Sequence, residues 1–354
     1  MRIVDRSLPI SSTADGANCG AVCASTGEPC DGDGRCGTTQ TAGAATIDAG
    51  LPSLRGRRVL LATDGSPASD AATKVAWELA TRHGALVEML HVVDDRPSLI
   101  PPPLDVMLAF TDEVSRERTY DDQVRALKWR ASHIVDAQVD WEPRILFGTP
   151  ARTIAFEAHA ADAALIVMGL RRYSRADRIT NDETTLSTIR VAGRPVLAVV
   201  GEADTLPTRV LSAMDFSTAS VAAAHFAAQV MRAHGKITMA YVPPLAGYHP
   251  DDNTQIIHEL GIAAAFERYA SVLRAHDCTV DHVVLHHELR RPIASAIADH
   301  AELMHADMIA VGNVGHGRME RWLLGSVSQD LVRDAKCSLL IVPAAPGHDD
   351  DASP

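Results

Sequence analysis

The sequence predicts an α/β fold made of two similar domains in tandem, each a five-stranded parallel sheet with helices on both faces. Short apolar runs alternate with longer helical stretches along most of the chain, which is typical of parallel strands buried between helices. The same succession of segments occurs twice, in 55–201 and in 207–344. A length of 354 residues also suits two domains.

The two copies correspond element by element. RRVLLATDGSPAS (57–69) matches TRVLSAMDFSTAS (208–220), each with an apolar run, an aspartate and a serine two residues later. Helical stretches at 68–83 and 219–234 follow, and both end in His-Gly, where we expect glycine to stop the helix. The remaining predicted segments are strands within 85–93, 138–148, 194–200, 236–244, 279–288 and 337–343, long helices within 104–137 and 251–276, and helix-strand pairs within 149–169 and 291–312.

Composition excludes several classes of protein. The formal net charge is −12, so we expect neither a nucleic-acid binder nor a protein of anionic membrane surfaces. The sequence has no run of about 18 apolar residues, so no transmembrane helix is predicted. The start of the chain lacks a basic region followed by an apolar one, so no secretory signal is predicted and a cytoplasmic protein is expected.

The segment 1–54 is predicted to be a disordered extension, because it is rich in small and polar residues. It holds Cys19, Cys23, Cys30 and Cys36, whose spacing fits zinc sites poorly. A metal-responsive or redox-responsive tail remains the alternative. The acidic tail 345–354 is expected to be flexible.

A glycine pattern follows the fourth predicted strand of the second copy, with Gly312, Gly315 and Gly325-Ser326. We expect Gly312 and Gly315 to allow positive φ and close approach of the backbone to a ligand. Gly325-Ser326 starts a helix at roughly 326–335, whose free N–H groups favour an anion. A turn followed by a helix cap is the structural alternative. The pattern is neither the dinucleotide fingerprint nor Walker A.

The strand-one aspartate and this glycine pattern together resemble the universal stress protein family, over 56–343 and in its tandem form. The resemblance implies a Rossmann-like fold of the adenine nucleotide alpha hydrolase type. It also implies membership of the ATP-binding subset, which carries this glycine motif.

The resemblance places a nucleotide in the second domain. Asp215 would lie by the nucleoside, although capping the following helix explains it equally well. The backbone of Val242 would meet adenine, and Ala213 stands where the family often has proline. The predicted nucleotide-binding residues are Ala213, Met214, Asp215, Ser217, Val242, Val311, Gly312, Gly315, His316, Gly317, Gly325, Ser326, Val327 and Ser328.

The first domain departs from the motif. Arg172 replaces the second glycine, and Asp182-Glu183 replace Gly-Ser. A carboxylate about 4 Å from a phosphate charge costs on the order of 4 kcal/mol at an effective dielectric of 20. We therefore expect one ATP per chain, although Arg171, Arg172, Arg175 and Arg178 leave an unusual anion site open.

The expected function is that of an ATP-binding regulatory protein of the stress response, with or without Mg²⁺. A weak ATPase or autophosphorylating phosphotransferase is one alternative, and a nucleotide-free interaction module is another. No catalytic or metal-binding residue is predicted, since His282, His286 and His287 have no evident further ligands. The sequence does not distinguish ATP from other adenine nucleotides, such as cyclic AMP, as the ligand. The last strands of the two copies are expected to pair as an intramolecular pseudo-dimer, and a homodimer is left open.

Overall fold

The computed structural model describes residues 53–94, 113–170, 183–201, 203, 205–243, 252–285, 291–313, 324–334 and 336–344. For 113–119, 183 and 252–260 only the backbone is described. These residues belong to one compact unit, 50–354. The extension up to residue 52, with its four cysteines, and the tail from 345 lie outside the described residues.

In the part of the chain that the structure describes, each copy folds as five strands alternating with four helices, as predicted. The first domain consists of β1 (Arg58–Ala62), α2 (Asp70–His83), β2 (Leu86–Val93), α4 (Glu113–Val135), β3 (Arg144–Phe147), α5 (Pro150–Ala160), β4 (Leu165–Leu170), α6 (Glu183–Val191) and β5 (Val196–Val200). The second consists of β6 (Arg209–Met214), α7 (Thr218–Val230), β7 (Lys236–Tyr241), α8 (Asp252–Leu273), β8 (Thr279–Val284), α9 (Ile293–Leu303), β9 (Met308–Gly312), α10 (Ser326–Asp334) and β10 (Ser338–Val342).

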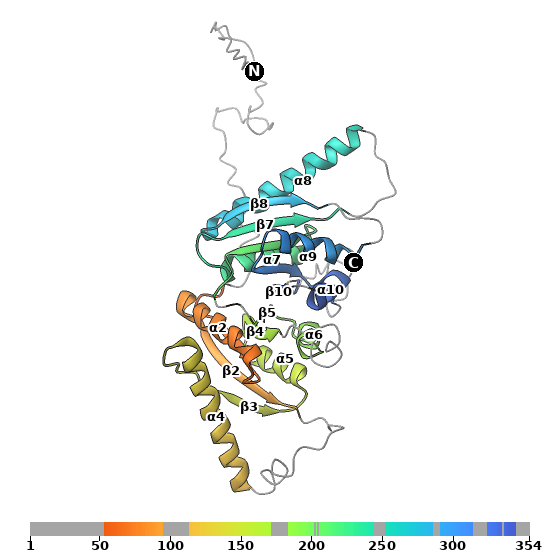
Figure 1. Cartoon of the computed structure of the whole chain (residues 1–354). Helices are drawn as coiled ribbons and strands as arrows, with labels where there is room; N and C mark the ends of the chain where they lie inside the picture. Colours follow the sequence, from red (N-terminus) through yellow and green to blue (C-terminus); the bar gives the residue numbers. More distant parts are fainter. Residues whose placement is uncertain are drawn as a thin grey trace, which may run out of the picture. The chain divides into compact units, whose positions relative to one another are not determined.

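The strands form one ten-stranded sheet in the order β3-β2-β1-β4-β5-β10-β9-β6-β7-β8. Among the described strands, neighbours run parallel except β5 and β10, which pair antiparallel in the middle of the sheet (Figure 1). Leu340 lies opposite Leu197 at this junction, and the amide of Val200 donates to Ser338 Oγ at 3.2 Å. The expected intramolecular pairing of the two last strands is therefore present.

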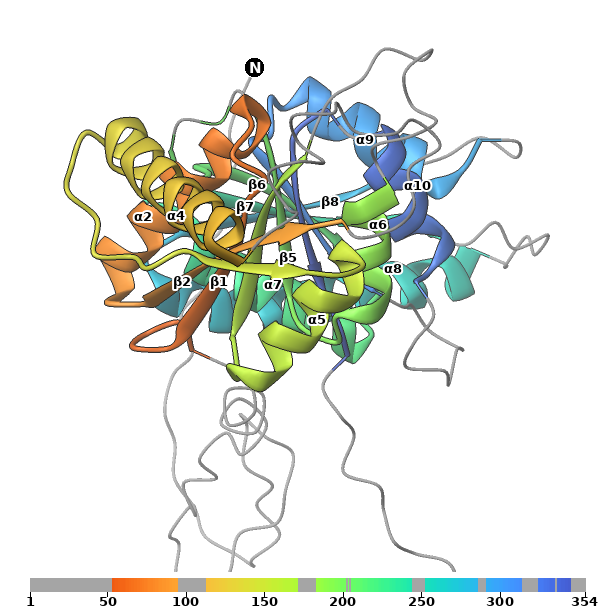
Figure 2. The same ribbon diagram turned by 90° about the horizontal axis from the view of Figure 1, so that it is seen from below.

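Helices cover both faces of the sheet (Figure 2), and each face has its own apolar core that runs through both domains. Strand residues alternate between the two cores: Leu61 lies in one, packed with α2, while Leu60 lies in the other. Both leucines are almost fully buried. Truncation of a core leucine to alanine costs about 2–5 kcal/mol of unfolding free energy, so these continuous cores hold the two domains together. None of the described helices has the length and apolar character needed to cross a membrane.

Helix α7 is buried on nearly all sides, because it packs between the sheet and α8 while the first domain contacts its C-terminal end. Gln229 near its end accepts from the amide of Leu54 at 3.0 Å through Oε1. His83 Nε2 lies 2.9 Å from the carbonyl oxygen of Gln229. Burial lowers the pKa of His83, which favours the neutral ring at this contact. The Ala-rich sequence of α7 thus reflects close packing on several sides.

The two His-Gly pairs have different roles. Gly84 caps α2 in the left-handed conformation, at φ 61°, as predicted. The same prediction for Gly235 is wrong, because α7 ends at Val230. Met231 is already extended, and the amide of Arg232 donates to Pro207 O at 2.8 Å. A Cβ on Gly235 would lie 2.7 Å from Thr208 O, so this glycine permits close packing where β6 starts.

Gly235→Ala should therefore lower the free energy of unfolding by about 1–3 kcal/mol, because backbone atoms must move to admit the methyl group. Gly261→Ala is the matched control. Gly261 lies in α8 with open space around its Cβ position, so alanine should stabilise by about 0.5–1 kcal/mol. Urea unfolding measures both. Equal effects of the two substitutions would contradict the packing role of Gly235.

Asp307, just before β9, fixes the start of β6. Its Oδ2 accepts from the Thr208 amide at 2.9 Å, the Thr208 hydroxyl at 2.7 Å and the Arg209 amide at 2.9 Å. Burial alone would raise the pKa of this carboxyl, but the hydrogen bonds from Thr208 and Arg209 outweigh it and lower the pKa. The charged carboxylate therefore stabilises the folded state.

Asp307→Asn should destabilise the protein near neutral pH by on the order of 1–3 kcal/mol, through weaker hydrogen bonds to a neutral acceptor. The extra unfolding free energy of the wild type over Asp307→Asn should be complete above the ordinary carboxyl pKa of 3.8. It should disappear as the pH falls through the lowered pKa of Asp307 in the folded state. Urea unfolding at a series of pH values tests this. Asp299→Asn, which breaks an exposed pair with Arg291, should change stability by at most about 1 kcal/mol. A difference between wild type and Asp307→Asn that does not depend on pH would contradict the assignment.

Candidate functional site

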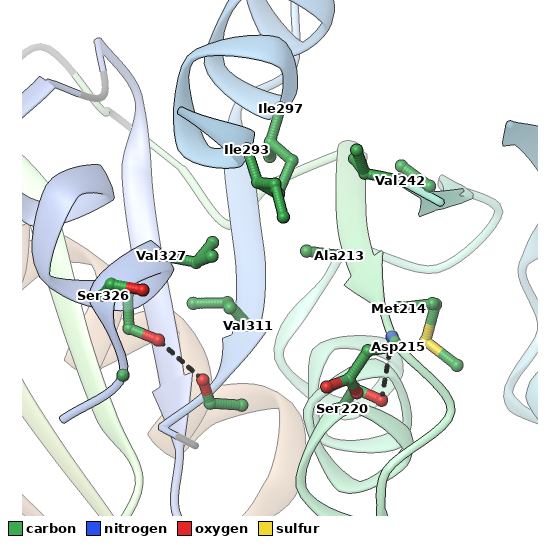
Figure 3. Close-up of a pocket in the computed structure, with 14 residues that line it drawn as sticks. Ala213, Met214, Asp215, Ser220, Val242, Ile293, Ile297, Val311, Ser326 and Val327 are labelled. Atoms are coloured by element: carbon green, nitrogen blue, oxygen red, sulfur yellow. Dashed lines mark hydrogen bonds between the residues drawn. The ribbon is translucent and has the colours of Figure 1, made fainter. Parts of the chain in front are cut away.

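A pocket of about 250 Å³ lies at the carboxyl ends of β6, β7 and β9. Strand β6 lies between β7 and β9, so the chain order reverses beside it, and open α/β sheets bind ligands at such reversals. The described lining residues are Ala213, Met214, Asp215, Ser220, Ala240, Val242, Ile293, Ile297, Val311, Gly312, Gly325, Ser326, Val327 and Ser328. Figure 3 shows them surrounding one common space.

One wall of the pocket is apolar. Val242 follows β7 and Val311 lies in β9, and both are buried. Ile293 and Ile297 point into the pocket from the first turns of α9, toward Val311 and Ala213 (Figure 3). Ala213 and Ala240 present only methyl groups and leave room between them. Such a slot suits a flat, largely apolar ring.

Asp215 supplies the carboxylate of the pocket, and its own turn holds it in place. Oδ1 accepts from the Ser217 amide at 3.0 Å and from the Ser217 hydroxyl at 2.5 Å. Ser217 Oγ accepts in turn from the Ser220 amide at 3.3 Å and caps α7. The capping residue of α7 is therefore Ser217, and Asp215 supports the cap through its hydrogen bonds with Ser217. The nucleoside contact of Asp215 remains a prediction.

An aromatic cluster fixes the same turn. Phe216 adopts φ 62°, a left-handed conformation that is unfavourable for a bulky residue. Its ring packs 5.3 Å from Phe266 and 5.3 Å from Tyr241, measured between ring centroids. Burial, and then the negative charge of Asp215, raise the pKa of Tyr241. Packing of Phe216 therefore stabilises a backbone conformation that presents the Asp215 carboxylate at the pocket.

The opposite side of the pocket is the N-terminus of α10. The Ser328 hydroxyl donates to Gly312 O at 2.7 Å and fastens the first turn of α10 to the end of β9. The Gly325 amide donates to Asn313 O at 2.6 Å, and Gly325 O accepts from the Gln329 amide at 3.0 Å. The N-terminal amides of a helix and its dipole attract negative charge. This end of the pocket is therefore suited to an anion.

The predicted role of Gly312 needs correction. It lies in β9, and its φ is not in the positive range that we expected. A Cβ at this position would lie 2.7 Å from Ala219 Cβ and 2.9 Å from the Ser220 amide nitrogen. Glycine is required because the start of α7 packs directly against the end of β9. This contact places α7, β9 and α10 around one pocket.

The structure brings most of the predicted site residues together. Those in the pocket wall are Ala213, Met214, Asp215, Val242, Val311, Gly312, Gly325, Ser326, Val327 and Ser328. Ser217 is not among the lining residues, but it donates to the Asp215 carboxylate. Gly315, His316 and Gly317 lie outside the described residues.

Sequence reasoning missed four residues of the wall: Ser220, Ala240, Ile293 and Ile297. The isoleucines stand four apart at the start of the helix after the third strand, which places them on one helix face. Ala240 precedes Val242 by two positions, which places both on one face of the extended chain. These spacings are the only sequence signals that point to the missed residues, and both are also typical of core positions.

The structure does not place a metal centre among the residues that it describes. His282, in β8, stacks on Phe266 with ring centroids 4.6 Å apart, which fits a packing role. His286 and His287 lie outside the described range.

Comparison with known proteins agrees with this architecture. The universal stress protein family matches residues 56–200 and 207–343. A universal stress protein of Mycolicibacterium smegmatis is 26% identical over 296 residues, which is 80% of this chain and 96% of that protein. The crystal structure of a universal stress protein from Archaeoglobus fulgidus superposes with a TM-score of 0.58 at 18% identity, covering 84% of this chain and 99% of the other. A functionally unknown Pseudomonas aeruginosa protein gives a TM-score of 0.51 at 14% identity, covering 81% and 93%. Because the family matches most of the chain in two consecutive copies, the chain belongs to the universal stress protein family and is a tandem member of it.

Proposed function

We propose that the second-domain pocket binds ATP and that the chain acts as a nucleotide-dependent regulatory protein in the stress response. One observation carries the proposal: apolar side chains, the Asp215 carboxylate and the N-terminus of α10 all line a single pocket. An adenine nucleotide has the same sequence of parts, an apolar base, a hydroxyl-bearing sugar and an anionic phosphate chain.

Each part of the pocket has a partner on the nucleotide. The base would lie between Ile293 and Val311, and the ribose hydroxyls would donate to Asp215. The phosphates would face the first turn of α10, where the helix end contributes about 0.3–1 kcal/mol and up to ~2 kcal/mol when partly buried. Each hydrogen bond from an amide to a charged phosphate adds about 1.5–3 kcal/mol. Mg²⁺ would be held mainly by the phosphates, since they supply the hard oxygen ligands that it prefers.

The pocket favours binding over turnover. Among the described lining residues, Asp215 supplies the single carboxylate, and its Oδ1 is engaged by the turn before α7. General acid-base chemistry would need another positioned group. Occupancy can instead be communicated through α10. With its amide oriented to accept, the side-chain oxygen of Gln329 lies 3.2 Å from Arg190 in α6 and 3.1 Å from Arg333. A ligand that orders the start of α10 would therefore act on the contact between the two domains.

Calorimetric titration should give one ATP per chain for the wild type and a loss of roughly a thousandfold in affinity for Gly325→Glu. A carboxylate about 4 Å from a phosphate costs on the order of 4 kcal/mol, which corresponds to that factor. Gly261→Glu makes the same change of charge in α8, away from the pocket, and should bind as the wild type does. Absence of ATP binding by the wild type would overturn the proposal. Two equivalents per chain would show that the first domain also takes ATP.

Asp215→Asn should weaken ATP binding by about tenfold, since a neutral amide is a poorer acceptor for ribose hydroxyls. Asparagine can accept the same capping hydrogen bonds, so thermal stability should change little. Asp64→Asn alters the equivalent aspartate of the first domain and should leave ATP affinity unchanged. A loss of affinity accompanied by an equal loss of stability would indicate that Asp215 acts only through the cap.

A further inference from the structure

The turn that follows β6 is built on a residue type that its backbone conformation disfavours. Phe216 adopts φ 62°, a left-handed conformation that is an outlier for a bulky side chain. Such a conformation persists only where the surrounding structure imposes it. Phe216 lies between Asp215 and Ser217, whose amide and hydroxyl both donate to Asp215 Oδ1, at 3.0 and 2.5 Å. The contacts that hold Phe216 in place therefore also set the position of the Asp215 carboxylate in the pocket.

Glycine is sufficient for this turn, as the first domain shows. That domain has a pocket of about 200 Å³ at the equivalent place, the carboxyl ends of β1, β2 and β4. Gly65 adopts φ 70° there, and Asp64 Oδ1 accepts from the Ser66 amide at 2.9 Å. Leu127 of α4 covers this turn, since its Cδ2 would lie 3.2 Å from a Cβ on Gly65. The turn itself requires no side chain at its centre, so ring contacts must offset the strain of Phe216.

The ring of Phe216 is attached to α8. Its centroid lies 5.3 Å from that of Phe266, in an edge-to-face arrangement, and 6.2 Å from that of Tyr269, in a stacked one. These two residues stand three apart and therefore share one face of α8. The ring also lies 5.3 Å from Tyr241 in β7. Aromatic pairs at such distances attract each other beyond the effect of the area that they bury, so the turn is joined to α8 by its own side chain.

The aromatic cluster of Phe216, Tyr241, Phe266 and Tyr269 lies at the margin of the core. Phe266 is fully buried and stacks on His282 of β8, with ring centroids 4.6 Å apart. The other three rings are only partly buried and pack against the core from outside. Regions with fewer buried apolar contacts open at a lower free energy than the centre of a core. A shift of α8 can therefore reach Phe216 without opening the sheet.

We propose that Phe216 is a positioning residue that couples the second pocket to α8, so that a nucleotide bound at Asp215 strengthens the packing of α8. The role of the nucleotide rests on the function proposed above, whereas the link between the turn and α8 rests on the aromatic cluster. The left-handed backbone at Phe216 and the packed ring require each other. A ligand that fixes the turn therefore favours packed α8, and by reciprocity a constraint that holds α8 in place raises the affinity of the pocket. This route is separate from the one through α10.

The variants Phe216→Ala and Phe216→Gly separate positioning from packing, because both lack the ring and only glycine adopts the left-handed conformation freely. Phe216→Ala should bind ATP about fivefold more weakly than the wild type, which corresponds to about 1 kcal/mol for a left-handed alanine. Phe216→Gly should recover most of this affinity. Leu79→Ala, at a fully buried position of α2 in the first domain, should lower stability and leave ATP affinity unchanged. Calorimetry that gives Phe216→Gly the same weakened affinity as Phe216→Ala would overturn the positioning role.

Hydrogen exchange of the α8 amides measures the coupling, and its first part needs no variant. Saturating ATP should slow exchange in 261–273 of the wild type. In Phe216→Gly the same titration should leave α8 unchanged, while the amides of α10 should be protected in both proteins. Two results would contradict the coupling: wild type that binds ATP without protection of α8, or equal protection of α8 in Phe216→Gly.

Exchange without ligand tests the link to α8 independently of the nucleotide. Phe216→Gly should exchange the amides of 261–273 about fivefold faster than the wild type, since the ring contacts of about 1 kcal/mol are lost. The amides of α5 in the first domain should exchange at the wild-type rate. Unchanged exchange in α8 would overturn the link. Absence of ATP binding by the wild type would instead remove the proposed function, and this comparison would still decide whether the turn and α8 are joined.

Discussion

The antiparallel pairing of β5 with β10 is the interaction on which the rest of the structure depends. Both strands are apolar on both faces and fully buried, so as free edges they would expose pairing groups and apolar side chains together. Their pairing, with Leu339 opposite Ala198 and Ile341 opposite Val196, removes both edges at once. It also joins the two apolar cores of each domain into cores that span the sheet. Neither domain is therefore a self-sufficient unit in the folded chain.

This arrangement explains why the two pockets are placed as they are. In each domain the strand order reverses beside the first strand, so a crevice opens at the carboxyl ends of β1 and β6. The helix that closes each crevice, α6 or α10, leads directly into β5 or β10 at the central junction. Arg190 and Gln329 join these two helices. A change in the position of either helix would therefore act directly on the paired strands β5 and β10, which hold the domains together.

Most of the fold could be predicted from the sequence, because strands buried on both faces leave continuous apolar runs and the runs recur in the second copy. The misassigned end of α7 shows the limit of such reasoning. His234-Gly235 resembles a helix stop, but tertiary packing on Pro207 and Thr208 determines where the helix ends and why glycine is needed. Gly312 is a similar case, since its neighbour in space is Ala219. Ile293 and Ile297 were missed because a binding wall and a core face have the same periodicity.

The two domains show how one backbone can present different chemistry. The turn after the first strand is left-handed in both, at Gly65 with φ 70° and at Phe216 with φ 62°. Glycine adopts this conformation without help, whereas phenylalanine needs its packing against Tyr241 and Phe266. The second domain therefore couples its aspartate turn to α8 and β7 through an aromatic cluster. The first domain joins its turn to β2 through contacts of Thr63 with Leu90 and His91, and the Ser66 hydroxyl is unpaired among the described residues. Because the sheet and much of the apolar wall of each pocket are shared, the differences lie in the turn and in the residues where α6 and α10 begin. Substitutions at these few positions can change the chemistry of one pocket without altering the sheet that both domains need.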